Sequence, residues 1–135
     1  MNPVVLDTHV LVWLLEGHRS LGKAARTTAD AALQEDGLLV SAITFWEVAM
    51  LARRGRLELN RAVDAWRNEV LGLGVREIPV TGHIGILATE LEAFPADPAD
   101  RIVAATAMAQ GATLVTADTR ILTAIGGPAV HDASS

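Results

Sequence analysis

Short apolar runs alternate along the chain with longer stretches in which apolar residues recur every three or four positions. The short runs are bounded by turn residues and predict buried strands, whereas the longer stretches predict amphipathic helices. We expect strands at residues 3–7, 37–41, 75–80 and 112–116, and an edge strand at 129–131. This alternation predicts an α/β fold: a three-layer sandwich with a mainly parallel central sheet of four or five strands.

Capping residues and glycines predict where each helix begins and ends. Ser20 is expected to cap a helix that runs to about residue 34, and Asn60 to cap a helix that stops near Gly72. The remaining helices are expected at residues 8–16, 42–54, 81–92, 98–110 and 118–125. No linker-like segment or internal repeat interrupts this order, so we expect a single domain over residues 1–135.

Composition narrows the class of protein. A chain of 135 residues that is 50% hydrophobic and 20% charged is expected to fold around one core rather than to be disordered. Its longest apolar run, residues 10–15, is too short to span a membrane, and Asp7 interrupts any N-terminal secretory signal. We therefore expect no membrane association and a cytoplasmic location. The lack of cysteine excludes disulfide scaffolds, thiolate zinc sites and cysteine nucleophiles.

The net charge of −5 argues against a protein that coats nucleic acid non-specifically. It does not exclude a nuclease, because an acidic active site gains positive charge from the metal that it binds. Basic residues are also unevenly distributed, with five arginines at positions 53, 54, 56, 61 and 67. These arginines form either a local basic face or an ordinary solvated helix face.

Carboxylates follow the expected strands, at the edge where open α/β sheets bind ligands. Asp7 ends the first strand, Asp118 closely follows residues 112–116, and Asp97 and Asp100 begin the helix before that strand. Each of these aspartates has an alternative role as a helix cap or a first-turn acid, and for Asp97 capping is the preferred interpretation.

Glu47 has no such alternative, because it lies inside a helix among apolar residues. Its carboxylate needs a partner, which is either a metal ion or one of Arg53 and Arg54. Carboxylates that converge within about 5 Å repel by about 3 kcal/mol per pair at an effective dielectric constant near 20, and a divalent cation relieves this repulsion. Oxygen ligands without cysteine or suitably spaced histidine favour Mg²⁺ or Mn²⁺ over zinc.

The order of these motifs resembles that of PIN-domain nucleases, and more narrowly of VapC-type toxins from toxin-antitoxin pairs. The motifs extend over nearly the whole chain: Asp7-Thr8, Trp46-Glu47-Val48, Asp97-Pro98-Ala99-Asp100-Arg101 and Thr116-Ala117-Asp118. The resemblance implies four catalytic acids that hold Mg²⁺ or Mn²⁺, namely Asp7, Glu47, Asp100 and Asp118. It also implies that Asp97 is an accessory acid and that Thr116 hydrogen-bonds a carboxylate or a water in the site.

By the same resemblance, the protein is a metal-dependent endoribonuclease that hydrolyses RNA phosphodiesters, binds an antitoxin and forms homodimers. Lys23 is the only lysine, so RNA contacts must come from arginines, and we assign them to Arg53 and Arg54. The apolar residues around Phe45 and Trp46, beside these arginines, suit a groove for an apolar helix of the antitoxin. For Trp46 itself, as for Trp66 and Phe94, we expect core packing rather than stacking on bases.

Other functions remain as alternatives. A PIN-like nuclease that processes RNA without an antitoxin would carry the same acids, and an inactive scaffold would only bind a partner. A receiver-like signalling domain needs two adjacent acids after the first strand, but Leu6 precedes Asp7. Residues 17–23 match a phosphate-binding loop except that Ala24 replaces the required Ser or Thr. The four histidines show no paired spacing and are expected to be ordinary surface or core residues.

Overall fold

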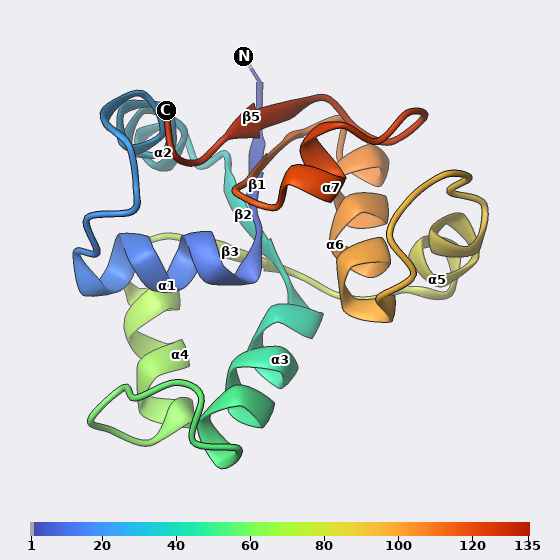
Figure 1. The fold of residues 1–135 in the computed structure, drawn as a ribbon. Helices are drawn as coiled ribbons and strands as arrows, with labels where there is room; N and C mark the ends of the chain where they lie inside the picture. Colours follow the sequence, from blue (N-terminus) through green and yellow to red (C-terminus); the bar gives the residue numbers. More distant parts are fainter. Residues whose placement is uncertain (1) are drawn as a thin grey trace.

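The computed structural model describes residues 2–135 and contains a five-stranded parallel sheet with the strand order β3-β2-β1-β4-β5 (Figure 1). The strands are β1 (Val4–Leu6), β2 (Leu38–Ser41), β3 (Arg76–Ile78), β4 (Thr113–Thr116) and β5 (Val130–Asp132). The predicted α/β fold is confirmed, and the edge strand expected near residue 130 is β5.

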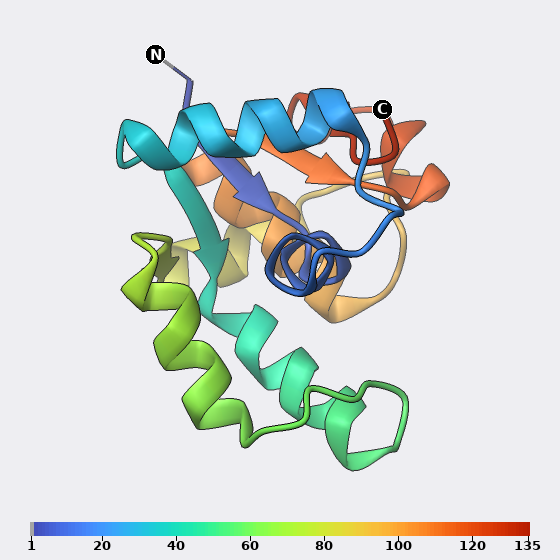
Figure 2. The ribbon, with the colours of Figure 1, turned by 90° about the vertical axis from the view of Figure 1, so that its left-hand side faces the viewer.

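Helices cover both faces of this sheet. Within residues 2–135 they are α1 (Thr8–Glu16), α2 (Lys23–Gln34), α3 (Ala42–Arg53), α4 (Val63–Gly72), α5 (Gly82–Thr89), α6 (Pro98–Ala109) and α7 (Thr119–Leu122). Helices α1 and α2 lie on one face and α6 on the other, with α5 packed outside α6, while α3 and α4 extend beyond the carboxyl ends of the strands (Figures 1 and 2). None of the described helices is long and apolar enough to cross a membrane.

The alternation of side chains along the strands creates two separate cores. Val4 and Leu6 of β1 pack in the core that includes α1 and α2, whereas Val5 packs with Val103 and Ala104 of α6 on the other face. Both faces of the central strands are therefore buried, as is usual for a parallel sheet between helical layers. Polar side chains are also buried at the carboxyl ends of β1, β2 and β4, where Asp7, Ser41 and Thr116 lie.

Several helix ends lie where the sequence predicts them. Gly17 ends α1 with φ at +65°, a left-handed conformation that glycine adopts without strain. Ser41 caps α3 by accepting a hydrogen bond from the Ile43 amide, and Thr81 caps α5 by accepting one from Ile84. Helix α5 ends at Thr89, before the predicted end near residue 92, and the chain then buries Leu91 in the core with α6.

Two predicted helix caps are wrong. Helix α2 begins at Lys23 rather than after Ser20, and its first amides bond to the C-terminal segment: Gly22 N donates to Ala133 O and Ala24 N to Ser135 O. Helix α4 begins at Val63, because Asn60 has φ at +58° and this left-handed conformation differs from the extended one of an N-cap.

Candidate active site

A hydroxyl group joins the carboxyl ends of two adjacent strands, β1 and β4. Asp7 directly follows β1, and its neighbour β4 ends at Thr116. Thr116 Oγ1 donates a 2.7 Å hydrogen bond to Asp7 Oδ2 and accepts one of 3.1 Å from the Asp118 amide. Thr116 therefore fixes the orientation of the buried Asp7 carboxylate and the position at which Asp118 enters the site.

Glu47 reaches the same region from α3. Thr8, at the start of α1, donates a 2.6 Å hydrogen bond from Oγ1 to Glu47 Oε1, and the same hydroxyl lies 3.2 Å from Thr44 Oγ1. Within residues 2–135, no ion pair joins Glu47 to Arg53 or Arg54. The half-buried carboxylate is thus held by a hydroxyl group and not by the alternative arginine partner.

The start of α6 supplies two further acids. Asp97 caps the helix by accepting hydrogen bonds from the amides of Ala99, at 2.9 Å, and Asp100, at 3.3 Å, so the preferred capping role is confirmed. Asp100 lies in the first turn, where its side chain is only 14% exposed. Pro98 at the first helical position fixes the direction of this turn.

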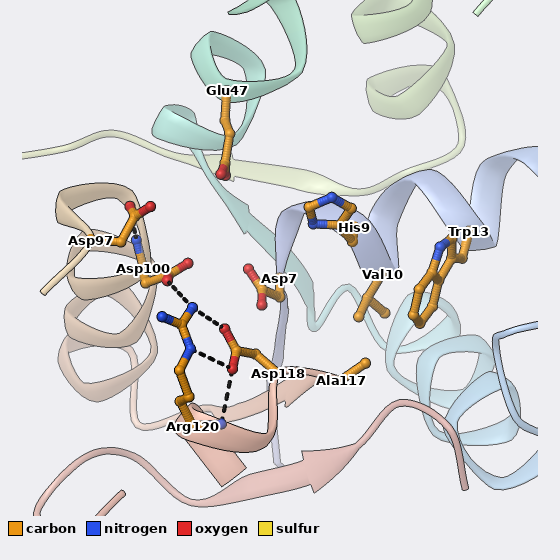
Figure 3. A pocket seen from close by; sticks show the side chains of 10 residues that line it. All are labelled: Asp7, His9, Val10, Trp13, Glu47, Asp97, Asp100, Ala117, Asp118 and Arg120. Atoms are coloured by element: carbon orange, nitrogen blue, oxygen red, sulfur yellow. Dashed lines mark hydrogen bonds and ion pairs between the residues drawn. The ribbon is translucent and has the colours of Figure 1, made fainter. Parts of the chain in front are cut away.

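These acids line one pocket of about 370 Å³ at the carboxyl edge of the sheet (Figure 3). The residues that line it are Asp7, His9, Val10, Trp13, Glu47, Asp97, Asp100, Ala117, Asp118 and Arg120. The structure therefore brings together all five acids selected from the sequence, although they come from the end of β1, from α3, from the start of α6 and from the loop after β4.

Arg120 is the positive group among these carboxylates. Its Nη2 lies 2.8 Å from Asp118 Oδ2 and 3.8 Å from Asp100 Oδ2, and its Nε donates to Asp118 Oδ1 at 3.2 Å (Figure 3). Asp118 also caps α7 by accepting a 2.9 Å bond from the Arg120 amide. Arg120 thus bridges an acid of α6 and the acid that follows β4.

The surroundings of the four proposed catalytic acids shift their pKa values in different directions. Burial raises the pKa of Asp7, against the opposing hydrogen bond from Thr116, and burial likewise raises the pKa of Glu47. Burial, together with the charges of the neighbouring carboxylates, raises the pKa of Asp100 to about 7. The side-chain hydrogen bond from Arg120 lowers the pKa of Asp118. Three acids are therefore destabilised as anions, whereas Asp118 is stabilised by an arginine.

The chemistry of this donor set fits a hard divalent cation. Every carboxylate in the pocket offers oxygen, and the repulsion that disfavours ionised Asp100 is the kind that a bound cation relieves. As the side chains stand, no three acidic or imidazole groups within residues 2–135 are arranged to hold one ion. The guanidinium of Arg120 lies between two of the acids, so cation binding requires the side chains to rearrange.

Three residues at this site were not predicted from the sequence. Thr8 holds Glu47, His9 lines the pocket, and Arg120 pairs with Asp118. Each of the three lies within two positions of Asp7 or Asp118, and this proximity is the signal that could have found them.

The predicted basic face is smaller than the sequence suggested. Arg61 pairs with Glu16 and Glu69, and Arg67 pairs with Glu77, so these two arginines support the fold. Arg53 and Arg54 lie at the end of α3 and line a hollow beside Trp46.

The expected core packing is wrong for Trp46. Its side chain is 56% exposed, whereas Trp66 and Phe94 are buried as expected. Trp46 lies on the exposed face of α3, whereas its neighbours Phe45 and Val48 lie on the buried face.

Comparison with known proteins identifies the family to which this chain belongs. The sequence matches the PIN domain family over residues 4–127, and the chain belongs to this family. Among individual proteins, it is 38% identical over 122 residues to Ribonuclease VapC22 of Mycobacterium tuberculosis, an alignment that covers 90% of this chain and 91% of that protein. The predicted resemblance to PIN-domain nucleases of the VapC type is therefore confirmed.

Solved structures support the same fold. A toxin-antitoxin complex from Klebsiella pneumoniae contains a chain with a TM-score of 0.61 and 20% identity, and the match covers 96% of both chains. VapBC2 from Rickettsia felis, bound to a promoter DNA fragment, gives a TM-score of 0.69 at 16% identity and covers 95% of this chain and 96% of that one. At these identities the likeness concerns the fold alone.

Proposed function

We propose that this PIN-domain protein is an endoribonuclease that hydrolyses RNA phosphodiesters with a divalent cation, and that it acts in the cytoplasm as the toxin of a toxin-antitoxin pair. The observation that carries the proposal is the single pocket in which Asp7, Glu47, Asp100 and Asp118 meet. Membership of the PIN family and 38% identity to a ribonuclease support the same activity.

The four acids would hold the cation, Mg²⁺ or Mn²⁺, which when bound lowers the pKa of water and stabilises negative charge on the phosphate. Asp97 keeps its capping role and contributes negative charge as an accessory acid. Thr116 and Thr8 orient the carboxylates of Asp7 and Glu47 through their hydroxyl groups. These hydrogen bonds hold the carboxylates in place and so lower the free-energy cost of keeping like charges close together.

Cleavage of RNA tests this function directly. We expect purified protein to cleave total RNA with Mg²⁺ or Mn²⁺, to stop in EDTA and to recover when the cation is restored. Asp7→Asn preserves the shape of a buried side chain but removes its charge, and should reduce cleavage by about 100-fold or more. Arg26→Gln, a change on the exposed surface of α2, serves as the control and should cleave normally. Cleavage that continues in EDTA would refute the cation-dependent mechanism.

A groove beside α3 supports the proposed antitoxin partner. Phe45 and Arg53 line a groove of about 490 Å³ between α3 and α4, and the exposed Trp46 lines an adjoining hollow. We call the two together the α3–α4 groove. It combines apolar side chains with arginines at its edge, as an amphipathic helix of an antitoxin would require. The toxin-antitoxin complex among the structural neighbours supports this partner.

We further propose that the protein forms homodimers and that Arg53 and Arg54 contact RNA.

A further inference from the structure

One basic side chain lies in the acidic pocket. Arg120 is the only arginine or lysine among the residues that line it, and five of the others are acids. The guanidinium uses Nε and Nη2 to reach both oxygens of Asp118, at 3.2 and 2.8 Å. Nη2 also lies 3.8 Å from Asp100 Oδ2, so a single positive group bridges two carboxylates from separate elements (Figure 3).

These are two of the four acids to which the proposed function assigns a divalent cation. The planar guanidinium binds a carboxylate through two parallel hydrogen bonds, and both oxygens of Asp118 are already engaged. Oδ1 already accepts from both Nε and the Arg120 amide, so a metal ion that takes this oxygen must displace one of these bonds. The two positive groups also repel each other, which makes simultaneous occupation of the space between Asp100 and Asp118 unfavourable.

We propose that Arg120 is the internal counter-ion of the acidic pocket and that a divalent cation binds by displacing its guanidinium from Asp118 and Asp100. The inference rests on the proposed function, because it presumes a cation at these acids. It has two consequences: Arg120 stabilises the pocket when no cation is bound, and it lowers the affinity of the pocket for cations.

The surroundings of Arg120 permit this exchange. Its side chain is 67% exposed, while those of Asp118 and Asp100 are 25% and 14% exposed, so the arginine covers the acids from the solvent side. An ion pair in this position is weak and exchanges readily. The backbone can stay in place, because Asp118 Oδ1 caps α7 through the Arg120 amide independently of the guanidinium.

Isothermal titration calorimetry of the RNA-free protein with Mn²⁺ alone tests the inference. The titration is done at about pH 8, so that the acids are ionised. Arg120→Gln should bind Mn²⁺ about three- to tenfold more tightly than the wild type, because an exposed pair and a like charge are removed. Arg120→Lys keeps the charge but loses the two-pronged geometry and should fall between them. Arg26→Gln removes an equal charge from α2, outside the pocket, and should stay within about twofold of the wild type.

Thermal unfolding provides a second readout that does not depend on RNA cleavage. In EDTA, Arg120→Gln should melt at a lower temperature than the wild type, because the acids lose their counter-ion, and Mn²⁺ should raise its melting temperature by a larger increment. Equal or weaker Mn²⁺ binding by Arg120→Gln would overturn the counter-ion role and leave the cation site standing. Failure of the wild type and all variants to bind Mn²⁺ would instead refute the proposed cation site, and the inference with it.

Discussion

At the scale of residues, Asp100 connects the electrostatics of the pocket to the stability of the fold. Its pKa is raised to about 7 by burial and by the nearby charges of Asp7 and Asp97. The folded state therefore binds a proton at Asp100 more tightly than the unfolded state, whose aspartates titrate near pH 4. As pH rises from about 4 to 7, the unfolded chain loses this proton while the folded protein retains it, so the contribution of Asp100 to stability falls, and it is lost above the folded pKa of about 7.

Replacement of Asp100 by asparagine removes this cost. In EDTA at about pH 8, we expect Asp100→Asn to unfold with a free energy higher than that of the wild type by on the order of 2 kcal/mol, a value reduced for solvent screening at the pocket mouth. Between pH 6 and 8 the wild type should lose about 1 kcal/mol through this residue, and the variant should show a flatter profile. Urea unfolding at the two pH values measures both effects.

Asp64→Asn is the matched control, because Asp64 also lies in the first turn of a helix but outside this pocket. Loss of its favourable interaction with the helix dipole should cost about 0.3 to 1 kcal/mol at either pH. If Asp100→Asn is destabilised like the control, Asp100 is merely a first-turn acid and the pocket does not strain it.

The sequence located the acids of the pocket and gave Thr116 a hydrogen-bonding role, but it did not name the acid that Thr116 binds or find the bond from Thr8 to Glu47. Aspartates after strands are visible in a linear pattern, because the strands themselves can be predicted and their carboxyl ends share one edge. The bonds from Thr116 to Asp7 and from Thr8 to Glu47 join positions 109 and 39 residues apart. Such pairings depend on the register of strands and the packing of α1 on α3, which a single sequence does not specify.

At the scale of elements, local patterns predicted the strands well and helix starts less well. The caps Ser41 and Thr81 use their own side chains, so a local signal was sufficient. Helix α2 has no side-chain cap, and its amides bond instead to carbonyls near residue 135. The start of α2 is therefore a tertiary feature, and Ser20 was an understandable but misleading local candidate.

The contact between α2 and the C-terminal segment depends on the absence of a side chain at Gly22. A Cβ at this position would overlap backbone atoms of Ser134 and Ser135. We expect Gly22→Ala to lower the free energy of unfolding by about 1 to 3 kcal/mol, because the C-terminal segment must move and α2 loses its backbone acceptors. Chemical unfolding monitored by circular dichroism measures the change.

Gly72→Ala provides the comparison for this element. Gly72 is the last residue of α4, and a Cβ there would have no neighbour within 4 Å. Alanine should therefore stabilise the protein by about 0.4 to 1 kcal/mol through the unfolded state. Equal effects of the two substitutions would show that the close approach at Gly22 is unimportant.

At the scale of the whole molecule, acidic and basic side chains gather on separate parts of the surface. The net charge is −5 and acids fill the pocket at the sheet edge, whereas Arg53 and Arg54 lie at the far end of α3 beside the exposed Trp46. A surface tryptophan beside arginines has the composition of an interaction hot spot. The proposed antitoxin and the proposed RNA substrate therefore approach a protein whose α3–α4 groove and acidic pocket are both near the carboxyl end of the sheet.

We expect the α3–α4 groove to be the binding site of the antitoxin. Co-expression with the proposed antitoxin should yield a complex on size exclusion, and the free protein should elute as a dimer. Trp46→Ala should weaken the complex by about 30-fold, as expected for a central aromatic anchor worth about 2 kcal/mol. Ile125→Ala removes an apolar side chain that is 80% exposed but outside the groove, and should bind normally. Equal binding by both variants would move the interface elsewhere, and a monomer that captures no partner would favour an RNA-processing nuclease without an antitoxin.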